Sequence, residues 1–115
     1  MVTAFSPDGS LLATGEPGGV VRLWDPITRH PVGDPMVGSA SNIFAVAFSP
    51  DGSLLASGGS DGVVRLWDPA TRHHLGELPG DSSAMAFSPE GSLLAVGNDD
   101  GSVLLYSRLA QLGRT

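Results

Sequence analysis

Histidine and carboxylate side chains are the groups of this chain that could bind a metal ion, and it holds three histidines and twelve acidic residues. His30, His73 and His74 occur in equivalent turns, without a third ligand at the spacing of a zinc site. The pair Asp99-Asp100 lacks the regular spacing of oxygen donors that a calcium loop requires. We therefore expect the histidines to be solvated turn residues and predict neither a metal site nor a cofactor.

Serine, histidine and aspartate could also perform nucleophilic catalysis, but their pattern does not indicate it. The serines lie in repeated turns, not in the strand–turn–helix context of a nucleophile elbow. The pair Gly18-Gly19 precedes a strand-like segment and not a helix, so it does not form a phosphate cradle. Because no nucleophile, base and oxyanion donor occur together, we predict that the chain is not an enzyme.

Composition narrows the function classes further. The chain has 115 residues, no cysteine and a net charge of −6, which describes at most one small domain without disulfides. An acidic chain repels phosphate groups, so we expect no nucleic-acid partner. No apolar run is long enough to span a bilayer, and the start lacks the pattern of a signal peptide. We expect a cytoplasmic protein without a membrane partner.

The elements that position these residues form a repeat. The segment 4–13 returns at 47–56 and, with Glu90 in place of Asp, at 86–95. Residues 4–33 and 47–76 align without gaps and are identical at 23 of 30 positions. A repeat of about 40 residues is typical of arrays of small modules.

Each module is predicted to contain several short strands. The second copy contains four short apolar segments at 45–48, 54–57, 63–67 and 74–78. Ser49-Pro50-Asp51-Gly52 and Ser60-Asp61-Gly62 are turn sequences between them, and Asp68 is placed to form an Asx-turn. No helical periodicity separates the segments, so each module is predicted to be a four-stranded antiparallel sheet of the kind that forms a propeller blade.

Three ordered motifs carry a family resemblance. Ala-Phe-Ser-Pro-Asp-Gly, Leu-Ala-Ser-Gly and Asp-Gly-Val-Val-Arg-Leu-Trp-Asp follow one another at 47–52, 55–58 and 61–68. This pattern resembles the WD-repeat family of β-propellers, with Trp-Asp pairs at 24–25 and 67–68 and Tyr106-Ser107 in the third copy. The resemblance implies an all-β fold in which residues 1–115 form a partial propeller, an incomplete ring of three four-stranded antiparallel blades at about 1–37, 43–79 and 84–113.

The resemblance also implies a structural hydrogen-bond network. In the family, a loop His, a Ser or Thr, a turn Asp and the Trp form a tetrad. Carried over, this role falls on six residues: Thr14, Trp24, Ser57, Asp61, Trp67 and Asp100. Gly18, Val96 and Tyr106 stand at three of the other positions, and no copy has the family's Gly-His pair, so the network is expected to be incomplete.

Three blades are fewer than a closed ring needs, because propellers typically have about four to eight. Two explanations remain open. The chain is a fragment or the carboxyl-terminal part of a longer propeller, as the alignment of Met1 with Phe44 inside a first strand suggests. Alternatively, chains associate as homo-oligomers, and two sets of three blades complete a ring.

Antiparallel strands sort the turns onto two ends of the blades, and one set of turns varies between copies. We expect partner binding at this variable end, through Glu16, Asn42, Ser60, Asp81, Asn98 and Asp99. Because several of these residues are acidic, the expected partner is a protein with a basic surface. The simpler alternative is that the carboxylates are solvated turn formers.

The expected function is a non-catalytic scaffold for protein–protein interaction, as the resemblance implies. One alternative is a propeller that binds a small ligand or a carbohydrate after oligomeric closure. Another is a remnant of a longer WD-repeat protein with no function of its own.

Overall fold

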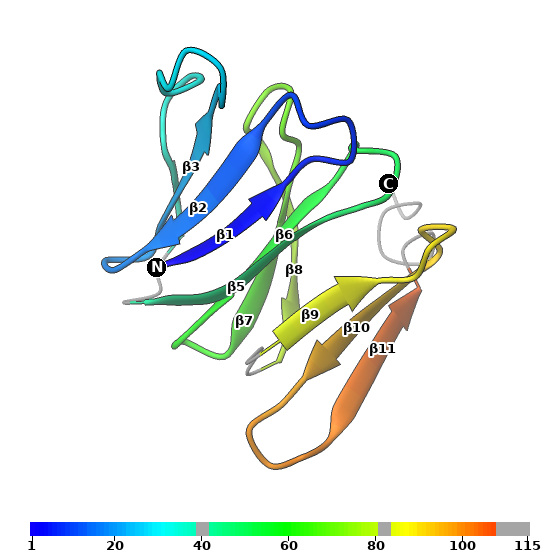
Figure 1. Ribbon diagram of the computed structural model, residues 1–115. Helices are drawn as coiled ribbons and strands as arrows, with labels where there is room; N and C mark the ends of the chain where they lie inside the picture. The colour runs from blue at the N-terminus through cyan, green and yellow to red at the C-terminus, as the bar shows by residue number, and fades with distance from the viewer. Residues whose placement is uncertain (39–41, 81–83, 108–115) are drawn as a thin grey trace.

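The computed structural model describes residues 1–38, 42–80 and 84–107, and these form three antiparallel sheets (Figure 1). The first sheet has the order β1 (Val2–Phe5), β2 (Leu12–Glu16), β3 (Val20–Trp24), β4 (Met36–Val37). The second has the order β5 (Ile43–Phe48), β6 (Leu55–Gly59), β7 (Val63–Trp67), β8 (His74–Pro79). The third contains β9 (Ala84–Phe87), β10 (Leu93–Gly97) and β11 (Val103–Ser107).

This architecture confirms the predicted all-β class and the antiparallel, blade-like sheets. The fourth strand expected for the third blade falls almost entirely on 108–112, outside the described residues. Ser107 is the last residue of β11, the third strand of this sheet. Within the described ranges, no helix is long and apolar enough to cross a membrane.

The strand register is the same in every copy, because the repeated sequence brings the same residue types opposite each other. Ala13 pairs with Leu23, and the corresponding pairs in the other sheets are Ala56 with Leu66 and Ala95 with Leu105. The first strands of the three sheets lie next to one another, with β5 between β1 and β9 (Figure 1). The sheets therefore stack side by side as consecutive blades.

Period-two pleating gives each sheet two different faces. We call one the aliphatic face, formed by an Ala, a Val and a Leu: Ala13, Val21 and Leu23, then Ala56, Val64 and Leu66, then Ala95, Val103 and Leu105. We call the other the aromatic face, formed by a Phe, a Leu and a Trp or Tyr: Phe5, Leu12 and Trp24, then Phe48, Leu55 and Trp67, then Phe87, Leu94 and Tyr106.

Unlike faces pack together in both cores. The aliphatic face of the first sheet packs against the aromatic face of the second, and Met36 and Val46 join this core. The aliphatic face of the second sheet packs in the same way against the aromatic face of the third, with Leu78 and Val96. Because both faces of the second sheet are covered, all five residues of β6 are buried.

The repeated Ser-Pro-Asp-Gly turns are held by side-chain hydrogen bonds. Ser49 is fully buried; its hydroxyl accepts from the Leu54 amide at 3.0 Å and donates to Asp51 Oδ1 at 2.7 Å. The same Oδ1 accepts from the amide and the hydroxyl of Ser53. The first copy repeats this arrangement around Asp8 and the third copy around Glu90, so the turn sequence is repeated for a structural reason.

The Asp-Pro-X-Thr-Arg turns close the third strands. Asp68 Oδ1 accepts from the Ala70 amide at 2.9 Å, which confirms the expected Asx-turn. The Arg72 amide donates to the Asp68 carbonyl, and Arg72 has a φ of 64°. Arg29 has a φ of 65° at the equivalent position, so in both copies an arginine in the left-handed conformation helps to reverse the chain.

Replacing Ser49 by alanine should destabilise the protein by about 1–3 kcal/mol, because the buried Leu54 N–H loses its acceptor. Ser53→Ala is the matched control, since the Ser53 hydroxyl is exposed and bonds the same carboxylate. Urea unfolding followed by circular dichroism measures both. An equal loss in the two variants would contradict the assigned role of Ser49.

The Asp8 turn should make part of the stability acid-sensitive. The amide and hydroxyl of Ser10 and the hydroxyl of Ser6 lower the pKa of Asp8 from 3.8 to about 2. Since the folded state favours the ionised form, this contribution is complete above about pH 4 and is lost as the pH falls toward 2.

We expect carbon NMR of the Asp8 carboxyl to show a titration midpoint near pH 2. The Asp8→Asn variant should lose less stability than the parent chain between pH 4 and 2. A midpoint at or above the ordinary value of 3.8 would contradict the assignment.

Candidate functional site

The turns sort onto two ends of the stacked sheets, because successive antiparallel strands run in opposite directions (Figure 1). One end carries the repeated turns described above. The other carries the β2–β3, β6–β7 and β10–β11 turns together with the segments that enter β5 and β9. We call this second end the variable end, because its residues differ between the copies.

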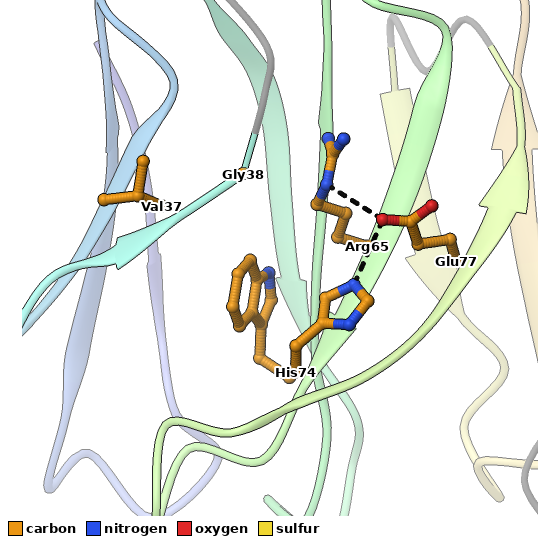
Figure 2. A pocket seen from close by; sticks show the side chains of 6 residues that line it. Val37, Gly38, Arg65, His74 and Glu77 are labelled. Carbon is orange, nitrogen blue, oxygen red and sulfur yellow. Dashed lines mark ion pairs between the residues drawn. The ribbon is translucent and has the colours of Figure 1, made fainter.

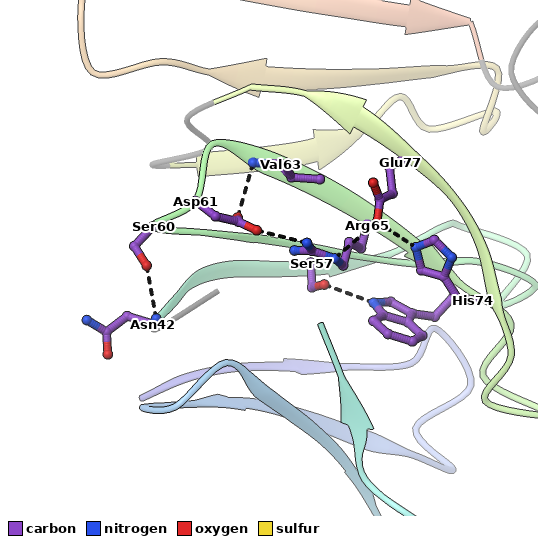
Figure 3. A network of polar contacts seen from close by, with 9 residues as sticks. Asn42, Ser57, Ser60, Asp61, Val63, Arg65, His74 and Glu77 are labelled. Carbon is purple, nitrogen blue, oxygen red and sulfur yellow. Dashed lines mark hydrogen bonds and ion pairs between the residues drawn. The ribbon is translucent and has the colours of Figure 1, made fainter. Parts of the chain in front are cut away.

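Asn42 joins the first two sheets at the variable end. Its backbone N–H donates to Ser60 Oγ at 3.1 Å (Figure 3). Its backbone carbonyl accepts from the Ser60 backbone N–H at 3.0 Å. Asn42 also forms a β-bridge with Pro17 in the β2–β3 turn. The structure thus brings together Asn42 and Ser60, two of the residues that the sequence singled out.

Gly80 plays the corresponding part between the second and third sheets. Its amide donates to the Gly62 carbonyl at 3.0 Å. A Cβ atom at Gly80 would lie 3.0 Å from Val96 and 3.7 Å from the side-chain oxygen of Asn98, so the backbone runs close to the third sheet. Asn98 itself donates through Nδ2 to Ser102 Oγ at 3.0 Å.

The carboxylates of this end are not alike. Glu16 pairs with Arg22 at 2.9 Å and Asp61 with Arg65 at 2.8 Å, so these two charges are balanced locally. Asp100 accepts from the hydroxyl and the amide of Ser102, which lower its pKa. Asp99 is exposed and makes no hydrogen bond or ion pair within the described part of the chain. Asp81, which was also expected here, lies outside the described residues.

A polar network runs from the variable end into the second sheet. The Arg65 side chain is only 9% exposed and contacts Asp61 at 2.8 Å and Glu77 at 3.4 Å. His74 Nε2 lies 3.4 Å from the same oxygen of Glu77 (Figure 2). Because an isolated buried guanidinium is costly, these two carboxylates make the burial of Arg65 tolerable.

This network lines a pocket of about 330 Å³ between the first and second sheets, formed by Val37, Gly38, Arg65, Trp67, His74 and Glu77 (Figure 2). A Cβ atom at Gly38 would lie 2.7 Å from Cδ and Nε of Arg65, so the chain after β4 lies directly against the arginine. The charged groups of the pocket pair with one another. The pocket therefore lies at the contact between two blades, with lining residues from both.

The six tetrad-like residues fall on equivalent strands and turns. The Trp67 ring N–H donates to Ser57 Oγ at 2.9 Å, and Trp24 donates to Thr14 Oγ1 at 2.9 Å. Asp61 binds the Val63 amide as well as Arg65, and Asp100 binds within its own turn. In the third sheet, the hydroxyl of Tyr106 donates to the Pro79 carbonyl at 2.6 Å.

Sequence reasoning missed the arginines and their partners. Arg22 and Arg65 occupy equivalent positions, and the first copy balances its arginine with Glu16, at the position equivalent to Gly59. In the third copy, Leu104 replaces the arginine, and its side chain packs into the second core. The repeated arginine on an otherwise apolar strand was the signal available in the sequence.

The histidines do not come together. His30 and His73 are exposed in their turns, while the His74 and Trp67 rings form a T-shaped pair with a centroid distance of 5.2 Å. Over 1–38, 42–80 and 84–107, no group of three or more His, Cys, Asp or Glu residues could hold a metal ion.

Comparison with known proteins gives a consistent result. The family model "WD domain, G-beta repeat" matches residues 2–25, 34–68 and 72–107. An uncharacterized WD repeat-containing protein of Nostoc sp. (strain PCC 7120) is 57% identical over 28 residues, which is 24% of this chain. That match covers 2% of the length of the relative. The second match begins just before β4 of the first sheet and continues through β5, β6 and β7 of the second. The third match likewise begins just before β8 of the second sheet and continues through β9, β10 and β11 of the third.

Removing the charge of Asp61 should destabilise the protein more than removing that of Glu77. Asp61→Asn leaves the buried guanidinium of Arg65 with its weaker, more exposed partner, and we expect a loss of about 1–3 kcal/mol. Glu77→Gln should cost less than about 1 kcal/mol, because the Glu77 side chain is 51% exposed. Urea unfolding of both variants tests the order, and the reverse order would contradict it.

Proposed function

Because the chain belongs to the WD-repeat family, whose model matches most of its length, we propose that it is a non-catalytic scaffold that binds a partner protein at its variable end. Repeats of this family generally mediate contacts between proteins. The whole protein's activity is part of this proposal, since the matched relative is far longer than the matched segment.

One observation carries the proposal: the β2–β3, β6–β7 and β10–β11 turns, whose sequences differ from copy to copy, lie together at one end of the stack. Asn42 ties the β2–β3 and β6–β7 turns together. The Gly80 backbone is bonded to the β6–β7 turn and runs close to Val96 of the third sheet. A binding surface needs copy-specific side chains on a rigid support, because ordering flexible loops weakens binding. The opposite end repeats the same Ser-Pro-Asp/Glu-Gly turn in all three copies and the same Asp-Pro-X-Thr-Arg turn in the first two, so it offers less specificity.

The partner surface is proposed to be basic. The chain carries a net charge of −6, and Asp99 projects from the variable end without a cationic partner within the described residues. Asp81 adds a second carboxylate in the segment that enters β9. Glu16 and Asp61 contribute less, because arginines of their own sheets already balance them. Complementary charge accelerates association and selects the partner.

Replacing Asp81 and Asp99 together by asparagine should weaken partner binding about 5- to 30-fold at low salt, since each exposed charge contributes about 0.5–1 kcal/mol. The partner is first captured from a cell extract with the tagged chain and identified by mass spectrometry. Its affinity is then titrated against both chains across a series of salt concentrations.

The matched control removes two charges from the repeated end, with Asp8→Asn and Glu90→Gln, which keep the acceptor oxygens of their turns. This control should bind like the parent chain. If Asp81→Asn/Asp99→Asn retained the parent affinity and the parent salt dependence, the basic-partner proposal would be wrong.

A further inference from the structure

Within the described part of the chain, each end of the stack leaves one face uncovered. The aliphatic face of the third sheet exposes Val103 and Leu105, both 64% exposed, whereas their equivalents Val64 and Leu66 are 0% and 4% exposed. The aromatic face of the first sheet exposes Phe5, which is 62% exposed, whereas its equivalent Phe48 is packed against a core. Large apolar faces of this kind mark association surfaces.

The two uncovered faces are of opposite kinds, and their side chains match an interface that the molecule already contains. Ala95, Val103 and Leu105 of the third sheet are identical in type to Ala13, Val21 and Leu23 of the first sheet. In the first core, that aliphatic face is covered by the aromatic face of the second sheet.

The covering face is also duplicated. Phe48, Leu55 and Trp67 cover the first sheet, and the uncovered aromatic face presents the same three residue types in Phe5, Leu12 and Trp24. An aliphatic face of the third sheet against an aromatic face of the first would therefore repeat the first core side chain for side chain. The β10–β11 pair of the third sheet and the β2–β3 pair of the first sheet have the same register as the β6–β7 pair of the second sheet.

We propose that two copies of this chain associate head to tail, the aliphatic face of the third sheet of each copy packing on the aromatic face of the first sheet of the other. The rings that pack beside Ala13 and Ala56 in the two cores come from aromatic faces alone. Two aliphatic faces placed together would lack such rings, so the contact joins unlike faces.

The pair closes because each copy supplies one face of each kind. Head-to-tail contacts either close into a ring or continue as a filament. Two copies together supply six sheets to one ring, and six lies within the typical range of about four to eight blades. In the closed pair, no apolar face of a first or third sheet remains open.

The first experiment measures the mass of the 115-residue chain by light scattering over a dilution series. We expect a reversible species of twice 11.8 kDa at the higher concentrations. A monomer at every concentration would overturn the proposal and favour cover by further repeats of a longer chain. A ladder of larger species would overturn the closed pair.

The second experiment separates head-to-tail from face-to-face association with Leu105→Glu on the aliphatic face and Phe5→Glu on the aromatic face. Both side chains are exposed in the single chain, so neither variant should impair folding. Each variant alone should dimerise at least about 100-fold more weakly, because a carboxylate would be buried in an apolar contact.

Mixing the two variants should restore a dimer, because the intact first sheet of the Leu105→Glu chain meets the intact third sheet of the Phe5→Glu chain. Ile27→Glu is the control: Ile27 is 88% exposed in a turn and belongs to neither face, so this variant should dimerise like the parent chain. Dimerisation of Phe5→Glu alone, or a mixture that stays monomeric, would overturn the head-to-tail arrangement.

Discussion

The packing of unlike sheet faces is the interaction on which the rest of this structure depends. Each strand alternates its side chains between two faces, so a sheet that carries Ala, Val and Leu on one side carries Phe, Leu and Trp on the other. The small residues of one sheet leave space that the rings of the next sheet fill. Such a sheet has two unlike apolar faces, and both must be covered to remove its apolar surface from water.

The polar contacts follow from this packing. A tryptophan on the aromatic face needs an acceptor for its ring N–H, and Thr14 and Ser57 supply hydroxyls from the neighbouring strand. An arginine on the same face needs a carboxylate, and the two copies meet this need from different positions, with Glu16 in one and Asp61 in the other. The turns at the variable end can therefore differ between copies while the packing beneath them is preserved.

The two ends of the stack accordingly have different roles. Serine hydroxyls and carboxylates close the repeated turns with the same hydrogen bonds, so these residues are constrained by the fold. At the variable end, backbone bonds of Asn42 and Gly80 support the turns, and the exposed Asp99 makes no hydrogen bond or ion pair with the other described residues. The family-model matches are offset from the sheets, so the second and third matches each include the outermost strand of one sheet and the first three strands of the next.

The sequence alone determined the all-β class, the number of modules and the turn chemistry, because strand alternation and turn motifs are local patterns that repetition makes unambiguous. It also pointed to the tryptophan–hydroxyl pairs, through the family pattern. Only the tertiary structure decided that Arg65 is buried between Asp61 and Glu77, that Gly38 lies against it, and which face of each sheet meets the next. These contacts join residues from different strands and sheets, and their distances depend on how the sheets stack, which no local pattern encodes.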